Sequence, residues 1–214
     1  KLDGAAVTVS ITGVCLSFIL SCFAFGTIAL GGEQAVVDVG RWISSGSFQA
    51  HWTLRFDTLT AVMLIVVTGV SSCVHIYSVG YMHHDKSIAR FMAYLSLFTF
   101  AMLMLVTADN LVQLFFGWEG VGVASYLLIG FWYHKESAHR AAMKAFVVNR
   151  VGDFGFVLGI LAIFALTGSV SFDHIFASVA SYQPATISIF GLPLPALEVV
   201  SVLLFIGAMG KSAQ

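Results

Sequence analysis

Charged residues are scarce in this sequence. Only 10% of its 214 residues are Asp, Glu, Lys or Arg, whereas 58% are hydrophobic. A soluble globular protein is about one-quarter charged, because polar side chains must cover its surface. Together with a mean hydropathy of +0.92, this composition excludes that class and predicts an integral membrane protein. The net charge of −1 and the lack of a basic patch with interleaved aromatic residues exclude nucleic acid as a partner.

Cysteine is also rare. Cys15, Cys22 and Cys73 lie singly in apolar runs, without a Cys-x-x-Cys pair or a Cys/His cluster. That spacing excludes a structural zinc site or an iron–sulfur cluster. No glycine fingerprint for a dinucleotide follows a predicted strand. We therefore expect no metal or redox cofactor on this chain.

Long apolar runs are what the sequence has in abundance. We predict an all-α polytopic membrane protein with about six transmembrane helices in one domain, residues 1–214, without a low-complexity linker. The first run is too long for the apolar region of a signal peptide, and we expect the last to be truncated, as part of a longer protein. Six runs reach or approach the length of about 20 residues that crosses a bilayer: Ala5–Leu30, Thr58–Gly80, Phe91–Thr107, Leu111–Tyr133, Ala145–Thr167 and Ala196–Gln214.

Lysine and arginine are distributed unevenly between the two sides of these spans. Basic residues near spans favour the inner side of a membrane. We therefore predict that the richer side is cytoplasmic, or faces the matrix if the membrane is mitochondrial. The richer side has Lys1, Lys86, Arg90, Lys135, Arg140, Lys144 and Arg150, against Arg41 and Arg55 on the other side.

Two connections on the outer side have structure of their own. Within residues 31–57, AVVDVGRWI and FQAHWTLRF flank a Ser/Gly turn, which predicts a small β-hairpin. In SFDHIFASVASY, Ser171 is a candidate N-cap before apolar residues at helical spacing, which predicts an interfacial helix. Asp109 and Asn110 are candidate caps of the fourth span.

A single carboxylate interrupts the fourth span. Glu119 lies about nine residues into it, roughly 13 Å at the helical rise and thus near the midplane. A charge there costs about 2.5–3.5 kcal/mol even on the lenient insertion scale. Gly117, Gly120 and Gly122 beside it allow close helix packing or room for water. We interpret Glu119 as an ion-transfer residue; the alternative is a structural carboxylate bonded to a neighbouring helix.

Lys211 is a second ionisable residue inside a span. Gly207 and Gly210 beside it predict a weakened or broken helix, as found where transporters hold ions. A buried lysine is suited to hold a proton in one state and to release it in another. The alternative is a side chain that snorkels to the membrane surface.

The fifth span contains the polar motif NRVGDFGF. Arg150 and Asp153 stand at a spacing that allows an ion pair on one helix face. This pair either fixes helix packing or is a polar station on an ion path. Gly152, Gly155 and Gly159 form a small-residue stripe, which predicts a helix–helix contact.

Two further groups are candidates for proton transfer. His75 lies near the inner end of the second span and is able to titrate near neutral pH, or is a satisfied structural histidine. Lys144 at the mouth of the fifth span either relays protons or snorkels.

Four motifs together resemble one family. VHIYSVGYM (74–82), ADNLVQLFFGWEGVGVASYLLIGFW (108–132), NRVGDFGF (149–156) and GAMGKSAQ (207–214) are similar to chain 5, or subunit L, of proton-pumping NADH:quinone oxidoreductase, respiratory complex I. The resemblance implies one half of an antiporter-like inverted-repeat fold, with the six spans as helices 2 to 7. It also implies that Glu119 and Lys211 form the interacting Glu/Lys pair of that family, and that Asp153 is its motif aspartate. The family continues past KSAQ, so a complete proton path is not contained here.

The expected function is that of a proton-translocating membrane subunit, which couples electron transfer from NADH to quinone to proton pumping. FMN, iron–sulfur clusters and quinone are then expected on partner subunits, with no redox chemistry on this chain. Expected partners are the other complex I membrane subunits, above all the adjacent antiporter-like subunit. The membrane is the bacterial plasma membrane or the mitochondrial inner membrane. The alternatives are a subunit of a multisubunit sodium/proton antiporter and a purely structural membrane subunit.

Overall fold

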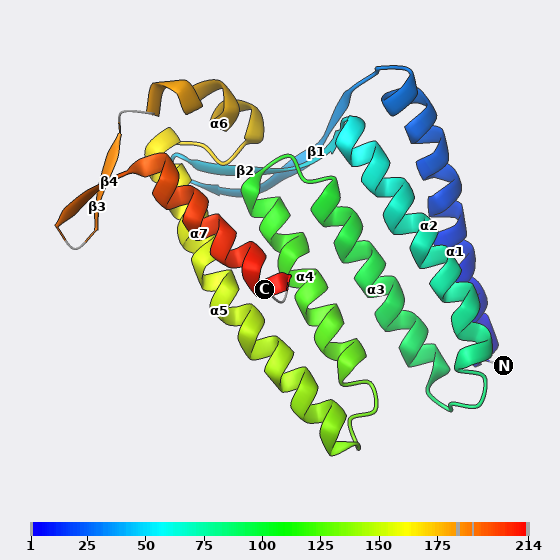
Figure 1. The fold of residues 1–214 in the computed structure, drawn as a ribbon. Coiled ribbons are helices and arrows are strands. Elements are labelled where there is room, and N and C mark those ends of the chain that lie inside the picture. The colour runs from blue at the N-terminus through cyan, green and yellow to red at the C-terminus, as the bar shows by residue number, and fades with distance from the viewer. Residues whose placement is uncertain (1, 183–184, 190, 213–214) are drawn as a thin grey trace.

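Five long helices form the body of the molecule (Figure 1). The computed structural model describes residues 2–182, 185–189 and 191–212. Each of the five is long and apolar enough to cross a membrane, α1 together with its π-helical extension over Phe25–Leu30. They are α1 (Leu2–Ala24), α2 (Thr58–Tyr81), α3 (Ile88–Val106), α4 (Leu111–Ile129) and α5 (Glu136–Thr167). The predicted all-α polytopic fold is confirmed, although α7 (Ala196–Lys211), the sixth predicted span, has only 16 residues.

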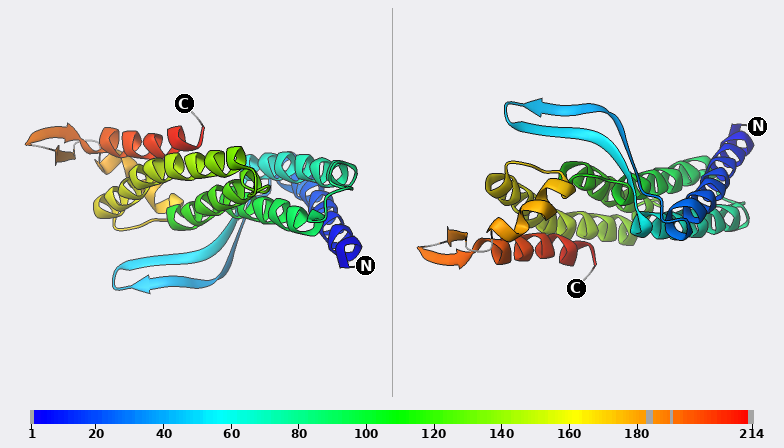
Figure 2. Two further views of the ribbon diagram at one scale, coloured as in Figure 1. Left: turned by 90° about the horizontal axis from the view of Figure 1, so that it is seen from below. Right: turned by 90° about the horizontal axis from the view of Figure 1, so that it is seen from above.

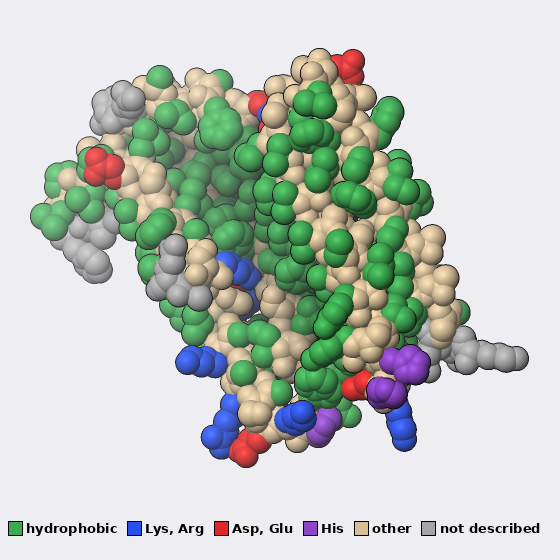
Figure 3. Space-filling model, turned by 45° about the vertical axis from the view of Figure 1, so that its right-hand side comes forward, with side chains coloured by type: hydrophobic (Ala, Val, Ile, Leu, Met, Phe, Trp, Pro, Cys, Tyr) green, Lys and Arg blue, Asp and Glu red, His purple; other side chains and the backbone are tan. Residues whose placement is uncertain are grey.

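Helices α2 to α5 lie side by side in one layer, α1 packs against both α2 and α3, and α7 packs against α5 (Figures 1 and 2). On the face shown in Figure 3, apolar side chains are spread along the helices, and basic and histidine side chains gather at the end that carries the α2–α3 and α4–α5 connections. Large residues such as Leu16, Phe23 and Phe154 remain exposed on the helices. A surface of this kind is stable against lipid tails and not against water.

Local signals explain where the helices begin and end. The Asp57 side chain accepts a hydrogen bond from Thr60 N and starts α2, and Asn110 accepts one from Gln113 N and starts α4. The prediction for Asn110 is confirmed, whereas Asp109 is not a cap, because its carboxylate binds Arg55 instead. Helix α5 ends at Gly168, whose φ of +71° favours glycine.

Helix α5 also begins earlier than its apolar run. It starts at Glu136 rather than at the predicted Ala145. Its first turns are polar and basic, and Arg140 pairs with Glu136 one turn earlier. A helix that emerges from the membrane no longer needs apolar residues, so hydropathy alone misses this extension.

The predicted hairpin within residues 31–57 is confirmed and is fastened to the helix ends. Strands β1 (Ala35–Ser45) and β2 (Phe48–Phe56) pair antiparallel and run beside the helical layer (Figure 2). Thr53 N donates to Gln113 Oε1 at 3.0 Å, and Asn110 Nδ2 donates to His51 O at 2.8 Å. Both bonds hold β2 over the start of α4.

An arginine joins the hairpin to two further segments at the same end of the molecule. The guanidinium of Arg55 donates to Asp109 at 2.7 Å, in the α3–α4 turn, and to Asp173 in α6 (Phe172–Ser178). Burial alone lowers the pKa of Arg55, but the hydrogen bonds to Asp173 and Asp109, together with the negative charges of these two carboxylates, outweigh that effect and raise it. Helix α6 confirms the helix that was predicted in this segment, and its place at the membrane interface stays a prediction. Ser171 occupies its N-cap position, but its side chain makes no capping bond.

One element between α6 and α7 was not predicted. Strands β3 (Thr186–Ile189) and β4 (Leu192–Pro195) form a second hairpin beyond the one-turn 3-10 helix at Val179–Tyr182. Its strands have only four residues each, and β4 contains prolines, which sequence rules count against a strand.

Candidate functional site

Four charged side chains from three helices meet in the middle of the layer. Glu119 comes from α4, Arg150 and Asp153 from α5, and Lys211 from the end of α7. The glycine stripe of α5 makes this possible, because a Cβ at Gly152 would lie only 3.1 Å from Gly210 Cα. Helices α5 and α7 therefore approach backbone to backbone, as small residues allow in membranes.

Arg150 is the centre of the cluster. Its guanidinium donates to Glu119 Oε2, and the same terminal nitrogen lies 3.5 Å from Asp153 Oδ2. The guanidinium carbon also lies 5.0 Å from the centre of the Phe146 ring, within the range of a cation–π contact. The contact with Asp153 agrees with the spacing in the motif, whereas the contact with Glu119 was not predicted.

Asp153 is held in place by an indole. Its side chain is 5% exposed, and Trp118 Nε1 donates to Asp153 Oδ1 at 2.8 Å. The Trp118 ring in turn stacks on Phe156 with a centroid distance of 4.9 Å. This bond fixes the orientation of the carboxylate.

Lys211 stands apart from the two carboxylates. Among the described residues, its Nζ has no hydrogen-bond partner and no ion-pair partner within 4.0 Å. It lies 5.7 Å from the centre of the Trp118 ring. The expected Glu119–Lys211 pair is therefore not closed in this structure, because Arg150 occupies Glu119.

Helix α7 is continuous where a break was predicted. It runs from Ala196 through Gly207 and Gly210 to Lys211. A Cβ at Gly207 would lie 2.6 Å from the Phe156 ring. Over the described residues, these glycines serve close packing against α5 rather than helix breakage.

The other two candidates lie outside the cluster. His75 is fully buried between α2 and α3, with Nδ1 2.8 Å from Ser71 O and Nε2 3.3 Å from Ser96 Oγ. Because a carbonyl only accepts, we assign the ring proton to Nδ1. Lys144 is exposed on α5.

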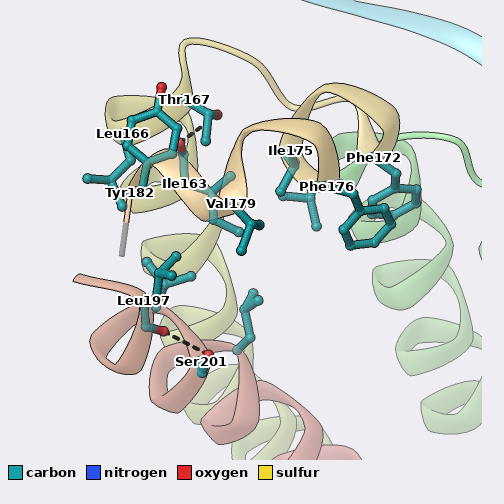
Figure 4. A pocket seen from close by; sticks show the side chains of 13 residues that line it. Ile163, Leu166, Thr167, Phe172, Ile175, Phe176, Val179, Tyr182, Leu197 and Ser201 are labelled. Carbon is teal, nitrogen blue, oxygen red and sulfur yellow. Dashed lines mark hydrogen bonds between the residues drawn. The ribbon is translucent and has the colours of Figure 1, made fainter. Parts of the chain in front are cut away.

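The end of the molecule that carries α6 contains an apolar cavity that lacks the chemistry of the cluster. It has a volume of about 410 Å³ and lies between α4, α5, α6 and α7. Apolar side chains such as Ile163, Phe172 and Phe176 line it (Figure 4). The hydroxyls of Thr167 and Ser201 bond to main-chain carbonyls of their own helices. The cavity therefore offers no charged group for ion transfer.

No group of three or more metal-binding side chains occurs in the part of the chain that the structure describes.

Sequence comparisons relate the chain to a membrane enzyme complex. Residues 42–92 match the family of the NADH-ubiquinone oxidoreductase (complex I) chain 5 N-terminus, and residues 108–214 match the NADH:quinone oxidoreductase/Mrp antiporter transmembrane family. NADH-quinone oxidoreductase subunit L of Rhodobacter capsulatus is 56% identical over 99% of this chain and 30% of its own length. NADH-ubiquinone oxidoreductase chain 5 of Arabidopsis thaliana is 54% identical over 99% of this chain and 31% of its own length. The chain thus spans less than one-third of these curated relatives.

Structural comparisons support the fold. An Mrp complex from Dietzia sp. matches with a TM-score of 0.71 and 23% identity, over 100% of this chain and 24% of the matched chain. The membrane-bound sulfane sulfur reductase, an archaeal respiratory membrane complex, matches with a TM-score of 0.75 and 17% identity, over 95% of this chain and 38% of the matched chain. At these identities the likeness concerns architecture alone.

Proposed function

This chain belongs to the NADH:quinone oxidoreductase/Mrp antiporter transmembrane family, in its chain 5 or subunit L branch, and we propose that it translocates protons within an NADH:quinone oxidoreductase. The whole subunit is about three times as long in the relatives. In this proposal the chain supplies the first half of a proton-translocating unit. FMN, iron–sulfur clusters and quinone belong to partner subunits.

One observation carries the proposal: a lysine without a counterion lies in the same cluster as a carboxylate whose counterion is an arginine. Glu119 Oε1 and Lys211 Nζ both lack hydrogen-bond partners among the described residues. Unsatisfied charges inside a membrane are costly, and they persist where they serve ion transfer. A packing role alone would favour the closed Glu119–Lys211 pair, which satisfies both groups.

The geometry supports a partner exchange around Glu119. When Arg150 holds Glu119, the Lys211 ammonium lacks a counterion and gives up its proton more readily. When Glu119 turns to Lys211, the ammonium is stabilised and holds the proton. Asp153, fixed by Trp118, keeps Arg150 in reach in both arrangements. We propose Glu119, Lys211 and Asp153 as the ion-transfer groups and Arg150 as the residue that competes for Glu119.

Sidedness and partners belong to the same proposal. The basic end faces the cytoplasm or the mitochondrial matrix, in line with the distribution of lysine and arginine. The adjacent antiporter-like subunit and other membrane subunits complete the path. The membrane is the bacterial plasma membrane or the mitochondrial inner membrane.

A sodium/proton antiporter subunit is the second candidate. The shared family and the fold of the Mrp complex favour it, whereas the chain 5 match over residues 42–92 and the curated relatives favour the first candidate. A native gel of gently solubilised membranes, probed with an antibody to the exposed strand β1, separates the two. Comigration with NADH-oxidising activity supports the oxidoreductase, and a separate band without it supports the antiporter.

Substitution of Glu119 tests the role of the cluster. In the assembled complex, Glu119→Gln should lose most of the protons pumped per NADH oxidised, because the amide carries no charge to stabilise the Lys211 ammonium. Proton uptake by inverted vesicles, measured together with NADH oxidation, gives this ratio. Glu136→Gln is the matched control, since its carboxylate is 76% exposed at the basic end. An unchanged ratio in Glu119→Gln would overturn the role that we assign to this residue.

A further inference from the structure

Gly122 leaves a notch in α4 that the tip of Lys211 fills. A Cβ built on Gly122 would lie 2.5 Å from Lys211 Nζ, which is too short for a non-bonded contact between carbon and nitrogen. The next atoms, Lys211 Cε and Asn149 Nδ2, are 4.0 Å away. The ammonium therefore occupies the space that any other residue at this position would need.

The other glycines of α4 near Glu119 have a different surrounding. A Cβ at Gly117 would lie 2.6 Å from Leu105 N, and one at Gly120 would lie 2.9 Å from Ala101 Cβ, both on α3. These two glycines allow α3 and α4 to pack closely. Gly122 makes no such contact with a neighbouring helix backbone, so helix packing does not account for it.

We propose that Gly122 is a positioning residue for Lys211: its notch is the seat that the ammonium takes when it is released from Glu119. This inference rests on the proposed function, because it gives a place to one of the two states of the lysine. In the seat the ammonium faces the Trp118 ring at 5.7 Å, close enough for a cation–π attraction. Glu119 is meanwhile neutralised by Arg150.

Asn149 forms the rim of the seat. Its amide end and Lys211 Nζ both lie within 4.0 Å of the Gly122 Cβ position. Rotation of the amide presents its oxygen to the ammonium in place of its nitrogen. The seat thus combines a π face, an amide and an empty Cβ position, without a full negative charge. It therefore binds the ammonium weakly, so that Lys211 is able to leave the seat and pair with Glu119.

The exchange between the seat and Glu119 needs only side-chain rotation. Glu119 and Gly122 are three residues apart on one helix, so they lie on adjoining positions of the same face. Rotamer changes of this kind are fast compared with helix movements. Without the seat, the lysine has only the carboxylates of Glu119 and Asp153 as partners and remains with them.

The test places a methyl group in the seat of the full-length subunit within its assembled complex. Gly122→Ala should lower the protons pumped per NADH oxidised. Gly120→Ala adds the same methyl group to α4 against Ala101, and complexes of this control should keep the wild-type ratio. A wild-type ratio in Gly122→Ala overturns the proposal.

A double-mutant cycle adds a readout that general packing would not move. The thermal inactivation midpoint is measured for Gly122→Ala with and without Lys211→Ala. The cost of Gly122→Ala should vanish when Lys211 is shortened, whereas the cost of Gly120→Ala should persist. If Gly122→Ala does not assemble, rescue of assembly by Lys211→Ala supports the seat, and failure of rescue overturns it. Normal pumping by Lys211→Ala alone would instead overturn the proposed function.

Discussion

Two polar clusters lie among the apolar helices, and they differ in how completely their hydrogen bonds are satisfied. Around His75, the ring nitrogens bond to Ser71 and Ser96, and the Ser71 hydroxyl bonds to Thr99 Oγ1 at 2.6 Å. In the charge cluster, four buried atoms have no hydrogen-bond partner among the described residues: Glu119 Oε1, Arg150 Nε, Asp153 Oδ2 and Lys211 Nζ.

The contrast separates a packing network from a reactive one. A satisfied neutral network has one preferred arrangement, so it fixes two helices against each other. An incompletely satisfied set of charges has several arrangements of similar free energy, and each change of partner shifts a proton affinity. The structure therefore favours a packing role for His75, while its part in proton transfer stays a prediction. Incomplete pairing allows the charges of this cluster to exchange partners, which the proposed ion transfer requires.

The largest effect should follow from removal of the arginine. Arg150→Gln leaves Glu119 and Asp153 without their cation, and loss of such charged hydrogen bonds costs about 1.5–3 kcal/mol. Lys211 then becomes the only cation for Glu119, so complexes that assemble should also pump poorly. The yield of assembled complex and the protons pumped per NADH oxidised measure the two effects.

A matched arginine gives the control. Arg140→Gln breaks a pair with Glu136 whose side chains are 77% and 76% exposed, and exposed helix pairs contribute only about 0.3–0.5 kcal/mol. Equal behaviour of Arg150→Gln and Arg140→Gln would remove the distinction between the charge cluster and an ordinary surface pair.

Replacement of His75 probes the satisfied network and should have a smaller, purely structural effect. His75→Leu removes the ring bond to Ser71 O, which keeps its main-chain helix bond, and leaves the Ser96 hydroxyl without its imidazole partner, at about 1–3 kcal/mol for a buried group left unsatisfied. Assembled complexes should still pump at the wild-type ratio of protons to NADH, while their thermal inactivation midpoint falls. Thr99→Val removes a single hydroxyl of this network and should lower the midpoint less. Normal stability with lost pumping in His75→Leu would place the histidine on the ion path.

Much of the fold is predictable because its signals are local. Apolar runs predict the spans, and two short strand-like segments around a Ser/Gly turn predict the first hairpin. Asn110 predicts where α4 begins. The glycine stripe at Gly152 also predicts that α5 has a close helical neighbour. Each of these signals lies within a few residues, so one sequence suffices.

The pairing inside the cluster is not predictable in this way. Glu119 and Arg150 lie on different helices, and only the rotation of α5 relative to α4 brings them together. The position of Lys211 depends on the approach of α7 to Gly152, and the outer contact of Arg55 depends on three segments at once. Sequence patterns identify which residues are charged and buried. They do not show which charge faces which, because that depends on helix rotation and depth.

The smallest effect is expected at Asp85, a carboxylate at the basic end whose two oxygens both accept hydrogen bonds. Trp132 Nε1 donates to Asp85 Oδ2 at 3.0 Å, and Ser87 N donates to Oδ1 at 2.8 Å. The bond from Trp132, and then that from Ser87, lower the pKa of Asp85 below its ordinary value. A lowered folded-state pKa adds stability that is fully present above the unfolded-state pKa, about 3.9, and is lost as the pH falls through the folded-state value. The purified full-length protein should therefore show a difference in melting temperature between wild type and Trp132→Phe that is constant near neutral pH and shrinks below about pH 4. In an Asp85→Asn background, the same tryptophan change should give a difference without pH dependence, because no carboxylate titrates. A pH-dependent remainder in that background would mean that Trp132 acts on another group, and the contrast between satisfied and unsatisfied charges would then not extend to this loop.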